Sequence, residues 1–246
     1  LVPYFAKIPI RTGWLGEFRY GLLNDIRKLD TTKNHLMVEK FVSLSLQDDN
    51  YSLESLDFPS LSIDLVNQKN VLSKLSIDSS LRSLALCPGA EFGPAKKWPP
   101  EYYAEVARAY IDRGWNILCL GSPNDQETGE KIEFFHDLNK ENKFYNLIGK
   151  TFLNDAIDIL GFCDRVVTND SGLMHIAAAV GTPLVALYGP SSPAYTPPLT
   201  DNKKILRKME GYEKKREGDL ESGYHQSLLA IKPTEVMNAL EDMQKL

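Results

Sequence analysis

The stretch RVVTNDSGLMHIAAAVGTPLVALYG, residues 165–189, carries the pattern that decides the fold. Its two ends are apolar runs with the length of buried strands, and the segment between them is a short apolar helix pattern that ends at Gly181. Parallel strands need a crossover connection, which is usually a helix. The stretch therefore predicts a β-α-β unit and an α/β fold with a parallel sheet.

The same alternation continues upstream to about residue 82. Three more apolar runs, 81–87, 115–120 and 144–148, alternate with helix patterns at 101–114, 126–138 and 153–163. Strands that are apolar along their whole length are typical of parallel sheets covered by helices on both faces. Ligands bind at the carboxyl ends of such strands. We therefore expect the loops PGAEFGPAKKW, GSPNDQE and TNDSG, which each follow a strand, to form one pocket.

The composition is that of a globular protein. The chain has 246 residues, of which 43% are hydrophobic and 25% charged, and its net charge of −5 argues against a general nucleic-acid binder. Cys87, Cys119 and Cys163 stand singly in apolar runs, which predicts buried thiols in a reducing compartment rather than disulfides or a zinc site. No run approaches the ~18 apolar residues of a membrane span, and no signal peptide is evident. We expect a cytoplasmic protein.

The chain divides by composition into two parts. Residues 46–81 are polar and rich in Ser and Asp, which predicts a linker, and residues 1–45 then belong to an earlier lobe. The expected domains are 1–80, a remainder of an N-terminal lobe with the linker, and 81–246, a nucleotide-binding lobe that ends in a helix. The opening LVPYFAKIPI begins without Met, from which we expect a preceding part.

The octet TNDSGLMH, residues 168–175, is the strongest candidate for a site. If a helix begins near Ser171, its first amides face the pocket and suit a phosphate, and Gly172 allows a ligand to approach the backbone. His175 lies one turn further on the same face. The alternative is structural, with Asp170 or Ser171 as an N-cap and His175 as a core histidine.

Two further loops contain candidate ligand-binding groups. In PGAEFGPAKKW, Lys96 or Lys97 could neutralise a departing diphosphate, or the two are a solvated basic pair. Trp98 beside them indicates a structured loop or a core anchor. In GSPNDQE, Glu127 could accept hydrogen bonds from a ribose diol, with an ordinary acid in the first helical turn as the alternative.

Two weaker candidates lie further away. The rigid loop YGPSSPAYTPP follows a strand at the same edge and could contact a sugar. In RTGWLGEFRYGLLND, residues 11–25, Arg11, Trp14 and Arg19 could bind an anionic acceptor, or the arginines are solvated on a structured loop.

Several familiar motifs are absent from the sequence. We find no GxxxxGK[ST], no GxGxxG after a strand, no HExxH and no GxSxG. Nucleotide binding without these motifs points toward a sugar-nucleotide enzyme. We expect no metal site and no cofactor.

Four strings, CPGAEFGPAKKWP, VTNDSGLMHIAAA, PLVALYGPSSP and GYHQSL, together with RTGW and RYGLLND near the start, resemble the ADP-heptose:lipopolysaccharide heptosyltransferases of glycosyltransferase family nine. The longer PGAE loop resembles the heptosyltransferase II branch. The resemblance implies a GT-B fold of two Rossmann-like lobes, with the donor in the C-terminal lobe and an incomplete N-terminal lobe here. The family's first loop, with its proposed aspartate base, has no counterpart in this sequence.

The resemblance also implies roles for single residues. Lys96 would contact the donor diphosphate, Asp170 would hold heptose hydroxyls, and Ser171 and Gly172 would hold phosphates. The donor site would be completed by the residues His175, Glu127, Gly89 and Ala90, and the acceptor site would include Arg11, Trp14 and Arg19.

The activity implied is transfer of L-glycero-D-manno-heptose from ADP-heptose to the first heptose of a heptosyl-Kdo2-lipid A type acceptor, with inversion. The protein would work at the inner face of the cytoplasmic membrane of a Gram-negative bacterium, in peripheral contact with it. The alternatives are a donor-binding fragment without turnover, and another sugar-nucleotide enzyme such as a UDP-sugar epimerase.

Overall fold

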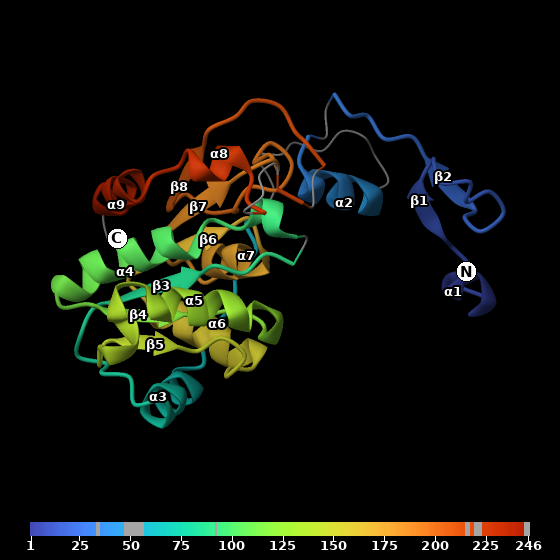
Figure 1. Ribbon diagram of the computed structural model, residues 1–246. Helices are drawn as coiled ribbons and strands as arrows, with labels where there is room; N and C mark the ends of the chain where they lie inside the picture. Colours follow the sequence, from blue (N-terminus) through green and yellow to red (C-terminus); the bar gives the residue numbers. More distant parts are fainter. Residues whose placement is uncertain (33–34, 47–56, 92, 215–216, 219–222, 244–246) are drawn as a thin grey trace. The chain divides into compact units, whose positions relative to one another are not determined.

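The computed structural model of the chain describes residues 1–32, 35–46, 57–91, 93–214, 217–218 and 223–243. It consists of two compact units, Leu1–Asp57 with Ala194–Pro197, and Phe58–Pro193 with Pro198–Leu246. Both units contain a parallel β-sheet, so the expected α/β fold with parallel sheets is confirmed (Figure 1).

The first unit is built on two short parallel strands. Its elements are α1 (Val2–Phe5), β1 (Thr12–Trp14), β2 (Asp25–Arg27) and α2 (Met37–Ser45). The backbone amide of Met37, at the start of α2, donates to the carbonyl of Tyr195 at 2.8 Å, and the Lys40 ammonium lies 5.4 Å from the centre of the Tyr195 ring. These contacts explain why a segment remote in sequence belongs to this unit.

The second unit contains a six-stranded parallel sheet in the order β5-β4-β3-β6-β7-β8. Its strands are β3 (Ser83–Cys87), β4 (Asn116–Cys119), β5 (Phe144–Asn146), β6 (Arg165–Asn169), β7 (Leu184–Tyr188) and β8 (Lys203–Arg207). Its helices and 3-10 turns are α3 (Leu65–Lys74), η2 (Pro94–Lys96), α4 (Pro100–Asp112), η3 (Pro123–Asp125), α5 (Gln126–Phe134), η4 (Phe135–Lys140), α6 (Leu153–Phe162), α7 (Gly172–Ala179), α8 (Gln226–Leu229) and α9 (Pro233–Glu241). This is the doubly wound order, and the direction of winding reverses between β3 and β6, where such folds bind ligands.

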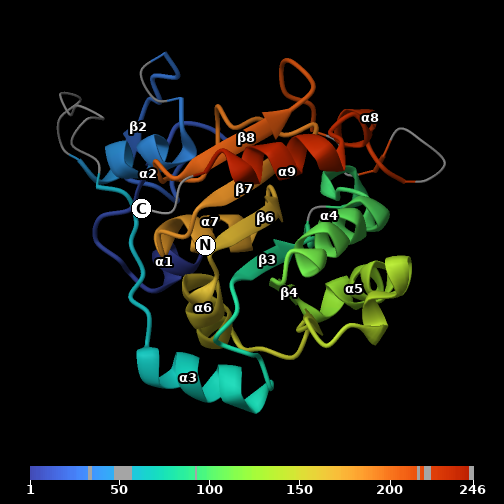
Figure 2. The ribbon, with the colours of Figure 1, turned by 90° about the vertical axis from the view of Figure 1, so that its left-hand side faces the viewer.

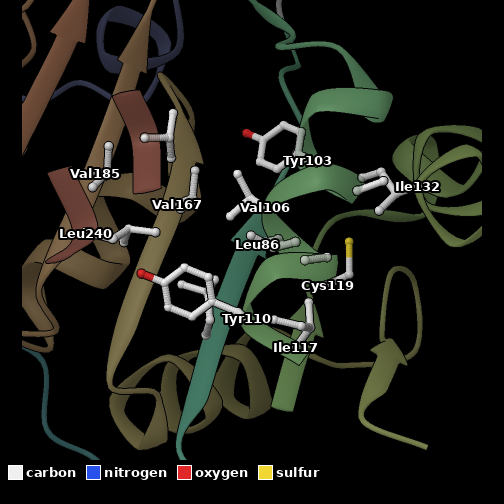
Figure 3. Packing of buried hydrophobic residues seen from close by; sticks show 14 of the residues in the cluster. Leu86, Tyr103, Val106, Tyr110, Ile117, Cys119, Ile132, Val167, Val185 and Leu240 are labelled. Atoms are coloured by element: carbon white, nitrogen blue, oxygen red, sulfur yellow. The ribbon is translucent and has the colours of Figure 1, made fainter. Parts of the chain in front are cut away.

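Helices cover both faces of this sheet, as the apolar strands predict. Figure 2 shows α4, α5 and α9 on one side of the strands and α6 and α7 on the other. Alternate residues of each strand point to opposite faces, so Leu84 and Leu86 pack under α4 while Ala85 and Cys87 face the other helices. In Figure 3 the α4 side chains Tyr103, Val106 and Tyr110 lie against β3 and β4. Because these side chains are buried, water is excluded from the interface between α4 and the sheet.

Two elements differ from the sequence-based expectation. The polar segment predicted to be a linker contains α3, whose Val71 and Leu72 are buried against the sheet unit, so the compact units divide at residue 57 and not at residue 80. Residues 47–56 of that segment lie outside the described residues. The edge strand β8 is not predicted by the sequence, because Lys203 and Lys204 interrupt its apolar pattern. The terminal helix with Pro233 in its first turn is confirmed as α9.

Candidate functional site

The three loops that follow β3, β4 and β6 form one pocket of about 670 Å³ at the carboxyl edge of the sheet. Its lining has two parts. The first contains every charged side chain of the lining and is formed by Gly89, Ala90, Glu91, Gly93, Pro94, Lys97, Gly121, Ser122, Asn124, Asp125, Ser171 and Gly172. The second, which we call the ledge and which is apolar except for Thr151, is formed by Thr151, Phe152, Leu153, Ala156, Leu173 and Ile176. The predicted meeting of the three loops at one edge is therefore confirmed.

Lys96 and Asp170 form an ion pair next to this pocket. The ammonium of Lys96 lies 2.6 Å from Oδ2 of Asp170, and the Asp170 side chain is only 8% exposed. Each residue directly precedes a lining residue, Lys97 and Ser171 respectively. A charge-assisted hydrogen bond of this length joins the loop after β3 to the loop after β6.

Lys97 forms a second ion pair within the lining itself. Its ammonium donates to Oδ1 of Asp125 at 3.0 Å, and Oδ2 of Asp125 accepts from the amide and the hydroxyl of Ser122 at 3.1 and 2.8 Å. A Cβ atom on Gly89 would come within 2.4 Å of Asp125 Oδ2. A residue without a side chain is therefore needed at position 89 for the two loops to pack this closely.

The buried side chain of Asn169, the last residue of β6, bonds to the loop after β3 and to α4. Its amide donates to the carbonyl of Pro88 at 2.7 Å, and its oxygen accepts from the amide of Trp98 at 3.2 Å and the hydroxyl of Tyr103 at 3.0 Å. Trp98 is fully buried and donates from Nε1 to the carbonyl of Ile231. Trp98 is thus a core anchor, and Asn169 fixes the loop that carries the lysines.

The N-terminal end of α7 opens onto the pocket. Ser171 occupies the N-cap position, but its side chain makes no capping hydrogen bond, and Asp170 is engaged with Lys96 instead. The structural alternative is therefore confirmed for Ser171 as the N-cap by position, although its hydroxyl caps no amide, and it is wrong for Asp170. The first amides of α7 have no partner within the helix, and the helix dipole gives this end a partial positive charge. The exposed backbone of Gly172, with nothing within 4 Å of a Cβ added there, leaves room for a ligand.

Other predicted site residues lie outside the lining. The Glu127 carboxylate is 81% exposed and bonded to the ammonium of Lys131 at 2.7 Å, a hydrogen bond that lowers the pKa of Glu127. The acids of the lining are Glu91 and Asp125; Asp125 is the N-cap residue of α5, and Glu127, in the first turn of that helix, points to solvent. The rigid loop after β7 also contributes no lining residue among those described.

His175 is exposed on α7, so the alternative of a core histidine is wrong. The surrounding protein atoms lower its pKa through desolvation, against an opposing effect of the Asp170 carboxylate. A lowered pKa favours the neutral ring, which can accept as well as donate a hydrogen bond.

In the first unit, Arg11 and Arg19 bond to carbonyl groups of their own loop. Arg11 donates to the carbonyls of Leu22 and Ile8 at 2.6 and 2.7 Å, and Arg19 donates to that of Trp14 at 2.9 Å. The loop is structured, as one of the two alternatives predicts. Whether this unit also binds an anionic acceptor stays a prediction.

Sequence reasoning missed several contributors to the site. Asp125 lies within a predicted loop but lacks a signal to separate it from its neighbours, and Asn169 has the pattern of a strand end. Phe152 directly precedes α6, and Leu153 is its first residue. The two residues are 83% and 63% exposed, which indicates that they form part of a binding surface. The three cysteines are buried and free, as predicted.

Metal-binding clusters and membrane-spanning helices are both lacking among the described residues. Within those ranges, no group of three or more His, Cys, Asp or Glu side chains is arranged to hold a metal ion. None of the described helices combines the length and the apolar character that a membrane crossing requires.

The fold and the pocket define a doubly wound α/β protein with a ligand pocket at the point where the direction of winding reverses. The family model of glycosyltransferase family 9 (heptosyltransferase) matches residues 1–225. The chain is 45% identical to lipopolysaccharide heptosyltransferase 2 of Escherichia coli over 98% of its own length and 70% of that protein. It is 44% identical to lipooligosaccharide heptosyltransferase 2 of Haemophilus influenzae over 98% of its own length and 72% of the relative.

A solved structure supports the same conclusion. The structure of the E. coli ADP-heptose lps heptosyltransferase II superimposes with a TM-score of 0.86 at 42% identity, covering 98% of this chain and 71% of that one. The chain belongs to glycosyltransferase family 9, the heptosyltransferases, and is accordingly a glycosyltransferase. The resemblance in the four sequence strings is thereby confirmed.

Proposed function

We propose that the chain transfers L-glycero-D-manno-heptose from ADP-heptose to the first heptose of the lipopolysaccharide inner core. The observation that carries this proposal is the pocket at the reversal point of the sheet, with the Lys96–Asp170 pair beside it. The names of the relatives, lipopolysaccharide heptosyltransferase 2 among them, support the choice of heptose and acceptor. The superimposed E. coli protein is an ADP-heptose heptosyltransferase, which supports the choice of donor.

The two parts of the lining suit the two parts of the donor. The adenine ring would pack on Phe152, Leu153 and Ile176 of the ledge. An exposed apolar surface beside polar groups suits a flat aromatic base. The diphosphate then lies over the backbone of Gly89 and the first amides of α7. Asp125, a carboxylate of the lining, would accept a hydrogen bond from the ribose, the role expected of Glu127.

In the reaction the acceptor hydroxyl attacks the anomeric carbon of heptose and loses its proton to a base. The bond between that carbon and the diphosphate oxygen breaks, and ADP leaves with the electron pair. Lys96 stabilises the charge that develops on the diphosphate, and Asp170 orients the heptose hydroxyls; electrostatic stabilisation of this kind contributes roughly 10²–10³ in rate. Family membership implies inversion, and ADP-heptose is a substrate, so no cofactor enters the reaction.

The proposal assigns the unit Phe58–Pro193 with Pro198–Leu246 to the donor and the unit Leu1–Asp57 with Ala194–Pro197 to the acceptor side. The acceptor would be of the heptosyl-Kdo2-lipid A type, with Arg11, Trp14 and Arg19 near its anionic groups. Because that acceptor is a lipid of the inner membrane, we place the protein in the cytoplasm, in peripheral contact with that membrane's inner face.

Two measurements on the same preparation test this proposal. Calorimetric titration with ADP-heptose reports donor binding, and incubation with heptosyl-Kdo2-lipid A reports transfer through the mass of the product. Binding together with a product one heptose heavier supports the proposal. Binding without product supports a donor-binding fragment. Tighter binding of UDP than of ADP, in the same calorimetric titration, indicates another sugar-nucleotide enzyme.

A further inference from the structure

Residues 58–64, which we call the strap, are tied to two helices that line the pocket. The amide of Leu61 donates to the carbonyl of Ala179 at the end of α7, at 2.9 Å. Ile63 packs so closely on α6 that a Cβ on Gly161 would come within 2.3 Å of its Cδ1. The amide of Asp64 donates to Oδ1 of Asp158 in α6 at 2.9 Å. The strap therefore holds α6 and α7 at fixed positions within one unit.

Asn67, in the first turn of α3, continues this connection. Its side-chain nitrogen donates to Oδ2 of Asp158 at 2.7 Å and to Oδ1 of Asp155 at 3.2 Å. A carboxamide has two N–H groups and a carboxylate has none, so one Asn67 side chain serves both acids. Asp158 is only 3% exposed, and without this donor two neighbouring carboxylates would repel each other in a poorly solvated place.

Asp155 carries the connection to the pocket. While its Oδ1 accepts from Asn67, its Oδ2 accepts from the backbone amide of Phe152 at 3.0 Å. Phe152 directly precedes α6 and forms part of the ledge with Leu153 and Ala156. A single carboxylate thus joins α3 to the exposed backbone turn that presents the ledge.

We propose that Asn67 is a positioning residue for nucleoside binding. It contacts no ligand, and it acts through Asp155 to hold the turn at Phe152 in the conformation that the base requires. The identity of the bound group as an adenine nucleotide rests on the proposed function. The inference assigns a positioning function to α3. This helix lies outside the pocket, and its sequence has the composition of a linker.

The chain offers a matched control for this inference. Asn70 is the same residue type on the same helix and is exposed, so Asn70→Ala removes an equal side chain without touching Asp155. We would compare it with Asn67→Ala, with the isosteric Asn67→Asp, and with Asn67→Ser, which retains one donor and guards against a variant that fails to fold.

The first readout is affinity, measured by calorimetry for ADP and for inorganic pyrophosphate. Asn67→Ala should raise the Kd for ADP about fivefold, the effect of losing one or two net hydrogen bonds. Asn67→Asp should raise it further through repulsion, and Asn67→Ser less. Binding of pyrophosphate, which does not reach the ledge, should stay within about twofold. Equal weakening of both ligands, or no change for ADP, would overturn the positioning role.

The second readout needs no ligand and separates this inference from the proposed function. Amide hydrogen exchange of residues 151–156, measured by mass spectrometry, should be faster in Asn67→Ala than in Asn70→Ala. Unchanged exchange contradicts the inference even if ADP binds. Failure of the unmodified chain to bind ADP contradicts the proposed function, and the exchange result then still decides whether Asn67 holds the turn.

Discussion

The Lys96 ammonium lies 2.6 Å from the Asp170 carboxylate, and this contact joins the loops that follow β3 and β6. These strands are neighbours at the point where the direction of winding reverses in the sheet. The pair therefore closes the site at the position where doubly wound folds bind their ligands. The two charges of the pair compensate each other. The Lys96 ammonium can therefore be held beside the pocket although its side chain is largely buried.

The two adjacent lysines should differ in effect, because their partners differ. Lys96→Ala removes the cation paired with Asp170 and should lower turnover by about 100-fold, as loss of a transition-state charge partner does. Lys97→Ala frees Asp125 and should mainly raise the Kd for ADP, by about threefold to tenfold. Steady-state kinetics of ADP release and ADP calorimetry separate the two effects. Equal, small effects at both positions would refute the role of Lys96.

Asp170→Asn should damage turnover and leave the unit folded. The substitution keeps the size and one acceptor oxygen but removes the charge, and the carboxylate does not cap α7. We expect turnover about 100-fold lower and a thermal midpoint close to that of the unmodified chain. Differential scanning fluorimetry beside the transfer assay checks both. A large drop in midpoint with unchanged turnover would show that the pair is only structural.

Two glycines of the pocket should respond in opposite ways to alanine. At Gly89 the new Cβ would meet Asp125 Oδ2 at 2.4 Å, so Gly89→Ala should destabilise the unit by about 1–3 kcal/mol. At Gly172 nothing lies within 4 Å, so Gly172→Ala should keep the stability and weaken ADP binding by occupying ligand space. Urea unfolding followed by ADP titration distinguishes them. Equal stability of the two variants would contradict the close packing described for the loop after β3.

The three cysteines should be inert toward thiol reagents in the folded protein. Cys87, Cys119 and Cys163 are buried, and burial raises the pKa of each thiol, which leaves little thiolate at pH 8. A disulfide exchange reagent should therefore modify them only after unfolding by denaturant. Rapid modification of any one under native conditions would show that the sheet unit opens locally.

Much of the sheet unit follows from sequence because its signals are local. Apolar runs separated by helix patterns predict parallel strands, and loops after such strands must share an edge. That reasoning is sufficient to place Gly89, Ala90, Ser171 and Gly172 in one pocket. It depends on periodicity and chain direction, and not on how side chains pack.

The remaining features depend on contacts between distant parts of the chain. Whether Asp125 or Glu127 faces the pocket depends on the residue at which α5 begins. Sequence patterns locate a helix end only to within about two residues. Asn169 gains its function from Pro88, Trp98 and Tyr103, to which no sequence pattern connects it. The helix α3 is polar on most of its surface, and only its packing against α6 distinguishes it from a linker.

Calorimetric titration of the chain with ADP-heptose, ADP and UDP tests the central claim, that the pocket is an ADP-heptose donor site, most directly. The ledge and the first amides of α7 predict a single site at which ADP-heptose and ADP bind at least about tenfold more tightly than UDP, a difference of about 1.4 kcal/mol. UDP binding as tight as that of ADP, or no binding of either adenine nucleotide, would contradict the claim.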